Sequence, residues 1–168
     1  KIMGNKIDAK KIMDDNQVPT VPGLNEISDK KAIEEFIKNV DFPIIVKAAS
    51  GGGGKGMRVV TSNEEINNAI NSAKAEAKKS FNDDNVYLEK FLTNPKHIEI
   101  QILADAHGNI ITLGERDCSI QRKHQKLIEE SPSEMLTNEK RKEISDLCKK
   151  AISSIGYEGV GTLEFLYE

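Results

Sequence analysis

Four consecutive glycines separate two short apolar runs, and this arrangement restricts the fold more than any other feature of the sequence. The run at 42–48 is compact and contains β-branched residues, so it predicts a buried strand, and residues 57–60 predict a second strand. Each glycine loses more backbone freedom on folding than alanine, about 0.5–1 kcal/mol in a regular element. A loop of this composition can present several N–H groups to phosphate oxygens. We therefore expect a strand–loop–strand unit that covers a phosphate, with a solvated hairpin tip as the alternative.

Two known phosphate-binding loops do not fit this segment. A P-loop requires lysine at the position where Met57 follows Gly56. The spacing of Gly51, Gly53 and Gly56 satisfies G-x-G-x-x-G, but that fingerprint is meaningful only where a helix follows, and here a strand is predicted. A Rossmann dehydrogenase domain is therefore disfavoured.

Lys47 lies on the otherwise apolar strand that leads into the glycines. A nearby anion would explain a cation in this position, since a lysine–phosphate contact at ~4 Å is worth up to about 4 kcal/mol at intermediate dielectric. The alternative is a lysine whose aliphatic chain lies along the surface with its charge in water. The lysine and the glycine loop together favour a phosphate ligand.

The remaining pattern alternates between helices and strands and predicts the fold class α+β, with antiparallel hairpins and a boundary near Lys90. Ser28 is predicted to cap one helix, and the segment from Ser62 to Glu65 reads as the capping box of another. The polar segment 116–130 is assigned no element. Helices are expected at 5–15, after Ser28, from Ser62 and at 137–155, and further strands at 86–91, 97–104, 110–115 and 160–167.

Composition and charge exclude several classes of protein. With 38% hydrophobic and 30% charged residues the chain has an ordinary globular composition. A net charge of −3 disfavours a nucleic-acid partner, and no stretch approaches the roughly 20 apolar residues of a membrane span. Cys118 and Cys148 have no metal-binding spacing, so we expect two reduced thiols and a cytoplasmic location, or the mitochondrial matrix in a eukaryote.

Several strings of residues resemble one enzyme family along essentially the whole chain. The most specific is the segment 115–126, which reads Glu-Arg-Asp-Cys-Ser-Ile-Gln-Arg-Lys-His-Gln-Lys. The others are residues 3–6, 21–23, 45–48, 51–57, 87–90, 94–101 and 161–165. Together they resemble the biotin carboxylase component of biotin-dependent carboxylases, which is a branch of the ATP-grasp enzymes.

The resemblance implies an ATP site with named residues. Lys6 and Lys47 look like the two lysines that hold the phosphates, and the stretch from Gly52 through Gly53 to Gly54 looks like the lid loop. The hinge strand that pairs with adenine is implied at Glu89, Lys90, Phe91 and Leu92, where Leu92 supplies a backbone N–H. His97 and Gln121 would lie by the ribose and His124 near the phosphates.

Two further residues are implied to be catalytic. Lys126 looks like a bicarbonate contact, and Glu164 looks like the first of two carboxylates that hold Mg²⁺, or Mn²⁺ in its place. A partly buried carboxylate on an apolar strand needs a partner, which favours the metal role for Glu164. Glu99 is left open between a functional residue and a solvated one. Cys118 is expected to be a small buried residue, not a nucleophile.

The implied fold is an incomplete ATP-grasp fold, in which two α+β subdomains with antiparallel sheets hold ATP between them. The domain limits we expect are 1–18 for an entry helix, 19–90 for a small lid subdomain with the glycine loop, and 91–168 for the first part of the large subdomain. The chain is expected to be a fragment, because the family pattern continues past its end with a second metal-binding glutamate and the biotin-side residues. The fragment alone should therefore not complete the reaction.

The implied reaction uses MgATP and bicarbonate, through carboxyphosphate, to carboxylate biotin on a carrier protein. The implied partners are the biotin carboxyl carrier protein and a carboxyltransferase, and the parent enzyme is expected to be a homodimer. Acetyl-CoA carboxylase, with its role in fatty acid biosynthesis, stays open beside the propionyl-CoA and pyruvate carboxylases. Another ATP-grasp ligase similar to carbamoyl phosphate synthetase, and a non-catalytic nucleotide-binding or oligomer-forming piece, remain the alternatives.

Overall fold

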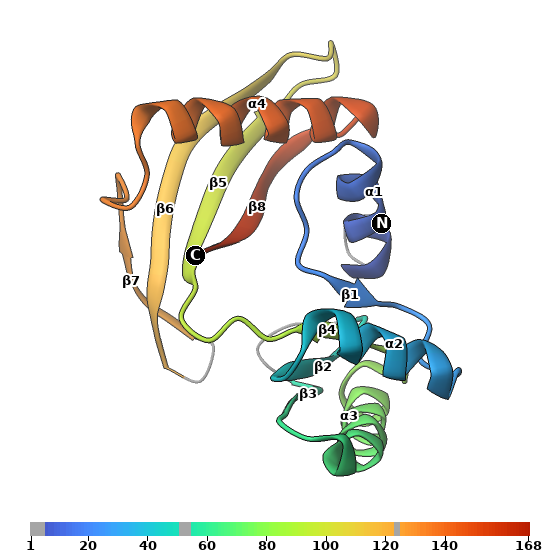
Figure 1. Cartoon of the computed structure of the whole chain (residues 1–168). Coiled ribbons are helices and arrows are strands. Elements are labelled where there is room, and N and C mark those ends of the chain that lie inside the picture. Colours follow the sequence, from blue (N-terminus) through green and yellow to red (C-terminus); the bar gives the residue numbers. More distant parts are fainter. Residues whose placement is uncertain (1–5, 51–54, 123–124) are drawn as a thin grey trace. The chain divides into compact units, whose positions relative to one another are not determined.

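The computed structural model describes residues 6–50, 55–122 and 125–168 and divides the chain into two compact units (Figure 1). The first unit comprises Lys1–Lys11 with Thr20–Thr93, and the second comprises Ile12–Pro19 with Asn94–Glu168. The division therefore falls between Thr93 and Asn94, and the first helix contributes residues to both units. The three domain limits expected from the sequence stay a prediction.

The first unit is a four-stranded antiparallel sheet with the strand order β1-β4-β2-β3. The antiparallel pairing of β2 with β3 across the glycine segment confirms the predicted strand–loop–strand unit. Gly51–Gly54 themselves lie outside the described residues. The elements are α1 (Lys6–Asp15), β1 (Gly23–Leu24), α2 (Lys30–Val40), β2 (Ile44–Ala48), β3 (Met57–Val60), a 3₁₀ turn (Asn63–Glu65), α3 (Ile66–Phe81) and β4 (Val86–Lys90).

The register of this sheet separates an apolar face from a polar one. Residues directly opposite one another in an antiparallel pair share a face. Val46 lies opposite Leu88, and both pack in the core with the buried faces of α2 and α3. The intervening residues, among them Lys47 and Glu89, point to the other face of the sheet. The predicted stripe of α3 is confirmed, because Ile66, Ile70, Ala73 and Ala77 are all buried.

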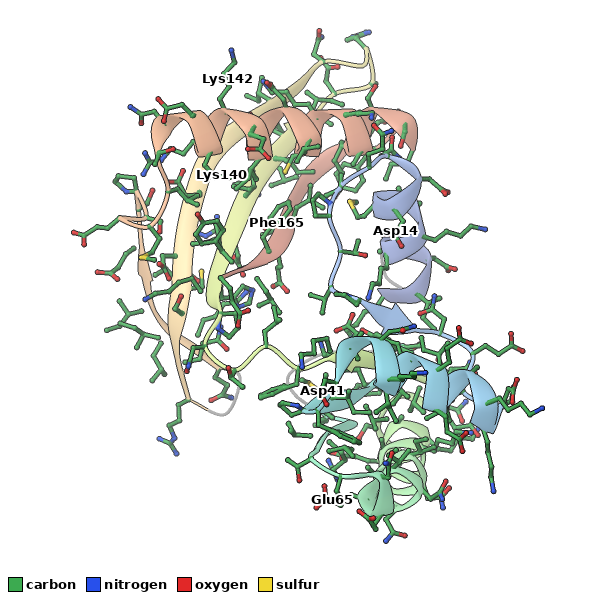
Figure 2. The ribbon with its side chains drawn as sticks, in the orientation of Figure 1. Asp14, Asp41, Glu65, Lys140, Lys142 and Phe165 are labelled. Carbon is green, nitrogen blue, oxygen red and sulfur yellow. The ribbon has the colours of Figure 1, made fainter. Side chains whose placement is uncertain are left out.

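Two predicted helix starts are wrong by one or a few residues. Asp29, and not Ser28, caps α2, since its carboxylate accepts the amide of Lys31 at 2.9 Å. Ser62 makes no capping hydrogen bond, because the carboxylate of Glu65 (Figure 2) accepts both the amide and the hydroxyl of Thr61. A 3₁₀ turn therefore precedes α3. In both places neighbouring residues have similar capping ability, so the sequence alone does not select one.

The second unit is a four-stranded antiparallel sheet with the order β7-β6-β5-β8, crossed by one helix on one face (Figure 1). Strand β6 is longer than expected: within the segment 116–130, where the sequence predicts no element, residues 116–122 extend β6 and residues 125–130 form β7. Its register shifts between Asp117 and Gln121, which removes the strict alternation that would have revealed a strand. The elements are β5 (Lys96–Ala104), β6 (Ile110–Arg122), β7 (Gln125–Glu130), α4 (Asn138–Ser154) and β8 (Gly159–Tyr167).

Helix α4 covers the apolar face of the second sheet. Ile98, Ile100 and Ile102 are buried on that face of β5, and α4 contributes four buried residues, including Cys148 and Ile152. The opposite face carries the alternate residues of β5 and their neighbours on β6 and β8. Both cysteines are buried and unpaired, as expected. Among the described residues, no helix is both long and apolar enough to cross a membrane.

Candidate functional site

The first group of predicted residues lies on the polar face of the first sheet. Ile45 is opposite Glu89, and Lys47 is opposite Tyr87, so all four share the face away from α2 and α3. Glu89 is only 6% exposed. Burial, with the charge of Glu89 as a smaller cause, raises the pKa of the Tyr87 hydroxyl well above its usual range. The hydroxyl of Tyr87 therefore stays neutral beside the carboxylate of Glu89.

The carboxylate of Glu89 is held by two lysines. Lys47 Nζ lies 2.5 Å from one oxygen of Glu89, and Lys10 Nζ lies 2.9 Å from the other. The anion beside Lys47 is thus the carboxylate of Glu89. The sequence analysis missed Lys10, which lies on α1 and is 79 positions from Glu89. No local spacing could have revealed this pair.

The predicted adenine hinge leaves one backbone donor available. The amide of Lys90 donates to Pro22 O at 2.9 Å, and the amide of Phe91 donates to Pro43 O at 3.1 Å. Within the described part of the chain, the amide of Leu92 donates to no protein acceptor. The side chain of Lys90 turns to the carbonyls of residues 41 and 42 instead. The Leu92 amide is therefore the group of this segment that can bind a ligand acceptor.

Lys6 lies beside the end of β2, close to where the glycine segment begins. Its amide donates to Ala49 O and its ammonium to Ala48 O, both at 3.3 Å. On the other side of the segment, Gly56 has a φ of +68°, and a Cβ there would lie 2.8 Å from the Cβ of Ala48. A side chain at position 56 would therefore disturb the base of the loop. The predicted phosphate contacts of Gly52, Gly53 and Gly54 lie outside the described residues.

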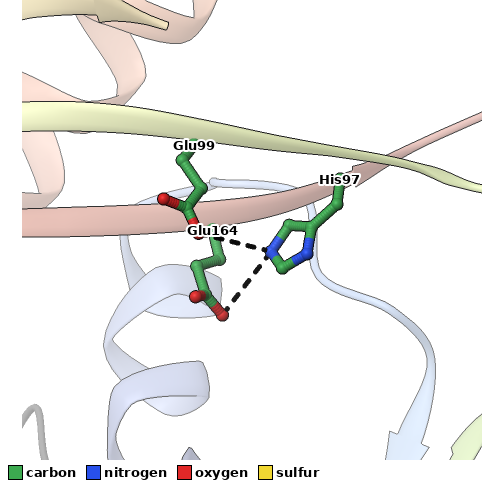
Figure 3. A group of neighbouring side chains, drawn as sticks. All are labelled: His97, Glu99 and Glu164. Atoms are coloured by element: carbon green, nitrogen blue, oxygen red, sulfur yellow. Dashed lines mark ion pairs between the residues drawn. The ribbon is translucent and has the colours of Figure 1, made fainter. Parts of the chain in front are cut away.

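The second group lies on the face of the second sheet that α4 leaves uncovered. β5 contributes His97 and Glu99, and β8 contributes Glu164 directly opposite Glu99 (Figure 3). Nε2 of His97 lies 3.8 Å from Glu99 and 3.7 Å from Glu164. Lys126 reaches the same place from β7, and its ammonium contacts both carboxylates, with 2.9 Å to Glu164. The structure thus gathers the two predicted catalytic residues and one predicted ATP residue.

Glu99 is a buried anchor of this group. It is 2% exposed, so the interpretation of Glu99 as a solvated residue is wrong. Lys126 contacts its Oε1, and Arg116 donates to its Oε2 at 2.8 Å. Arg116 also donates to Gln101 at 2.8 Å. The sequence analysis gave Arg116 no role of its own, although it belongs to the most family-specific string. Its position opposite Glu99 in the sheet explains the pairing.

Glu164, unlike Glu99, is an accessible acidic group. Its side chain is 57% exposed. The His97 imidazole beside it is the main cause that holds the pKa of Glu164 down at about 2, and the Lys126 ammonium adds to this effect, while burial acts in the opposite direction. Glu164 is therefore an ionised, half-exposed carboxylate at any pH near neutrality.

The tautomer of His97 follows from its other neighbour. The side-chain amide of Gln121 donates to the carbonyl of Cys118 at 2.8 Å and contacts Nδ1 of His97 at 2.6 Å. An amide that donates to Nδ1 leaves the proton of the neutral ring on Nε2. That N–H is directed at Glu99 and Glu164. His97 and Gln121 are thus brought together, whereas the predicted position of His124 lies outside the described residues.

The donor atoms of this face fit Mg²⁺ through Glu164. One atom each of His97, Glu99 and Glu164 lies within 4.8 Å of the others. Mg²⁺ prefers oxygen ligands and usually takes only one or two carboxylates from the protein, completing its shell with phosphate and water. Both oxygens of Glu99 already bind cations, and Nε2 of His97 carries a proton. Glu164 is therefore the residue that would hold the ion.

Cys118 takes no part in this chemistry. It is fully buried, and burial raises the pKa of its thiol despite the neighbouring Arg116. A buried thiol of raised pKa is a weak nucleophile. The expectation of a small buried residue is confirmed. His107, in the hairpin turn, is exposed and lies outside this group.

The two antiparallel α+β units, with a lysine before the glycine segment and carboxylates on the second sheet, define the class of ATP-grasp domains. Residues 5–168 match the family model described as the carbamoyl-phosphate synthase L chain, ATP binding domain. The chain belongs to this family.

The relatives that match this chain along its full length include biotin carboxylases. It is 51% identical to the biotin carboxylase of Haemophilus influenzae over 173 residues, which covers 100% of this chain and 38% of the relative. The structure of the biotin carboxylase–β,γ-ATP complex from Campylobacter jejuni has a TM-score of 0.93 and 46% identity and covers 98% of this chain and 37% of that one. The biotin carboxylase domain of the Hydrogenobacter thermophilus 2-oxoglutarate carboxylase, with MgADP, ADP and bicarbonate, has a TM-score of 0.93, 44% identity and the same coverage. This chain therefore spans a little over a third of the length of these relatives.

Proposed function

We propose that this chain is the ATP-binding part of a biotin carboxylase, which activates bicarbonate with MgATP and transfers the carboxyl group to biotin. The observation that carries the proposal is the group on the uncovered face of the second sheet. There, Lys126, an accessible ionised Glu164 and His97 surround one place, and the first two are the residues implied for bicarbonate and for the metal. The high identity to biotin carboxylases over the whole chain supports it.

The residues of the first unit would bind the nucleotide. The Leu92 amide and the carboxylate of Glu89 would contact adenine, and Lys47 and Lys6 would hold the phosphates together with the amides of the glycine loop. Lys47 starts from Glu89 and has three N–H donors, so it can turn to a phosphate oxygen. These contacts position the triphosphate for attack and do not themselves form covalent bonds.

The residues of the second unit would place the acceptor. Bound Mg²⁺ would neutralise charge on the phosphates. When Glu164 turns to the ion, Lys126 keeps Glu99 as its partner and has donors left for a bicarbonate oxygen. That oxygen would attack the γ-phosphorus, ADP would leave, and carboxyphosphate would form. Carboxyphosphate would then break down to carbon dioxide and phosphate. The ureido nitrogen of biotin would capture the carbon dioxide and give up its proton, which the released phosphate can accept.

The partners belong to the same proposal. Biotin on a carboxyl carrier protein would be the acceptor, a carboxyltransferase would use the product, and the whole enzyme would act as a homodimer in the cytoplasm.

Carbamoyl phosphate synthesis is the second candidate, because the matching family model carries that description. It also begins with the phosphorylation of bicarbonate, but its next acceptor is ammonia instead of biotin. The acceptor therefore decides between the two.

A chimera tests this proposal directly. The chain replaces the corresponding segment of the Haemophilus influenzae biotin carboxylase, which it matches along its whole length. We expect bicarbonate-dependent ADP release that free biotin stimulates, and a loss of at least about 100-fold in Lys126→Met, the range seen when a charge-stabilising donor is removed. Lys142→Met, an exposed lysine of α4 (Figure 2), is the matched control and should keep the activity.

Two results of this assay would count against the proposal. A folded chimera whose ADP release responds to ammonium and not to biotin would favour the carbamoyl phosphate route. Full activity in Lys126→Met would remove the assigned role of that lysine.

A further inference from the structure

The polar face of the first sheet contains one more cation than the proposed nucleotide site requires. Glu89 has two carboxylate oxygens, and each binds one lysine, Lys47 at 2.5 Å and Lys10 at 2.9 Å. The side chains of all three are largely buried, with Glu89 at 9%, Lys10 at 13% and Lys47 at 21% exposure. Only Lys47 and Glu89 have a proposed ligand. Within the described residues, the side chain of Lys10 contacts Glu89 and not the Leu92 amide.

The fold provides space for Lys10. Gly23 on β1 lies opposite Glu89 in the sheet, and a Cβ at that position would lie 2.7 Å from Lys10 Nζ and 3.3 Å from Cγ of Glu89. It would also lie 2.9 Å from the backbone oxygen of Leu88. The strand next to β4 thus has no side chain at the one place where the ammonium of Lys10 reaches the carboxylate. The backbone of β1 thus leaves room for the ion pair between Lys10 and Glu89.

A buried carboxylate with a single lysine partner would resist the loss of that partner, because an unpaired buried charge is strongly unfavourable. If Lys47 is to leave Glu89 for a phosphate, something must keep Glu89 neutralised. Lys10 is already bound to the second oxygen and can do so without moving. The second lysine therefore lowers the barrier to moving the first.

We propose that Lys10 is a positioning residue that holds Glu89 paired while Lys47 turns from Glu89 to a nucleotide phosphate. The inference rests on the proposed function, because it assigns the anion that Lys47 turns to. Lys10 itself touches no phosphate. Both lysines pair with Glu89 in the structure, and once Lys47 turns to a phosphate, Lys10 is the lysine that stays paired with it.

The first experiment needs no nucleotide. The lysines of the free chain are acetylated competitively with acetic anhydride, and the rates at single lysines are read by peptide mass spectrometry. In Lys10→Met the whole carboxylate is left to Lys47, so its ammonium is paired with Glu89 more fully and is less available to the reagent. The rate at Lys47 should therefore fall by about threefold or more. The exposed neighbour Lys11 provides the matched control, since Lys11→Met should leave Lys47 unchanged. An unchanged rate in Lys10→Met would overturn the shared carboxylate.

The second experiment measures MgATP affinity by calorimetry in two backgrounds. With Glu89 present, Lys10→Met should raise the Kd about tenfold, and Lys10→Arg should restore it to within about twofold, because arginine also neutralises a carboxylate. In a Glu89→Gln background, Lys10→Met should change the MgATP affinity by no more than about twofold, since no carboxylate is left for Lys10 to hold while Lys47 turns. A purely structural role would weaken binding equally in both backgrounds, and that result would overturn the proposal.

Failure of this inference is distinguishable from failure of the proposed function. A wild-type chain that does not bind MgATP counts against the proposed nucleotide site. The acetylation rates of the free chain still decide whether Lys10 and Lys47 share Glu89. Binding by the wild-type chain with no effect of Lys10→Met keeps the proposed function and rejects the role of Lys10.

Discussion

Each of the two units contains one buried glutamate that binds two cations, and the difference between the two lies in the cations. Glu89 binds two lysines, whereas Glu99 binds Arg116 and Lys126. Arginine presents a planar fork that holds a carboxylate in one geometry, while a lysine ammonium is a mobile point charge. In the second unit the lysine also contacts the accessible Glu164. The comparison suggests one division of roles in both units: Lys10 and Arg116 anchor the buried carboxylates, and we propose that Lys47 and Lys126 are the cations that turn to a ligand.

The largest loss in the free energy of unfolding is expected for Glu99→Ala. It would leave Arg116 and Lys126 beside a buried vacancy, and breaking a buried ion pair from one side costs about 3–5 kcal/mol. Because both cations are partly exposed, we expect the lower end, about 3 kcal/mol, in the free energy of unfolding measured with urea. Glu129→Ala, which removes the exposed partner of Arg116, is the control and should cost less than about 1 kcal/mol. Equal losses in the two variants would contradict the role of Glu99 as an anchor.

Gly23→Ala should have a smaller effect on stability. The added Cβ would lie 2.9 Å from the backbone oxygen of Leu88 and 2.7 Å from Lys10 Nζ, and overpacking of this kind costs typically about 1–3 kcal/mol. Thermal unfolding measures the loss. Gly108→Ala is unsuitable as a control, because the positive φ of Gly108 would strain an alanine there. Ala9→Gly on α1 instead shows how much stability a small backbone change costs. A Gly23→Ala variant as stable as the parent would show that Lys10 does not need this space.

The smallest effect on the free energy of unfolding is expected for Lys126→Met. Its consequence is measured best as a change in the pKa of Glu164. The pKa of Glu164 is about 2, below its usual 4.5, so its ionised form stabilises the fold above pH 4.5, and this contribution is lost as the pH falls through 2. Removing Lys126 should raise the pKa of Glu164 toward its usual value, while His97 keeps part of the shift. Carbon-13 NMR of the Glu164 carboxyl group, recorded as a function of pH, measures this pKa. A pKa that stays at about 2 in Lys126→Met would assign the shift to His97 alone.

Much of the fold could be predicted, because its signals are local. The stripe of α3 and the alternation of β5 follow from which side chains are buried, and burial selects apolar residues at regular spacing. Strand β7 gave no such signal. All six of its residues are exposed, so nothing selects for alternation. In β6 the cause is different, because register shifts interrupt the alternation of side chains that would predict a strand.

The site was predictable only where the resemblance supplied it. Lys126 and Glu164 come from the family-specific strings, and the structure brings them within 2.9 Å of each other. The pairing of Lys10 with Glu89 joins residues 79 positions apart and depends on the register of β1 against β4. The burial of Glu99 likewise depends on the positions of β6 and β8 beside β5. Contacts of this kind follow from the fold and cannot be read from residue spacing.

We propose above all that Lys47, one of the two lysines on Glu89, binds a nucleotide phosphate. Calorimetric titration of MgATP into the chain tests it most directly, with Lys47→Ala compared against Lys38→Ala, an exposed lysine on α2. The account predicts that Lys47→Ala weakens binding at least about tenfold, which corresponds to roughly 1.4 kcal/mol, and that Lys38→Ala binds like the parent. Equal affinity of the parent and Lys47→Ala would contradict it.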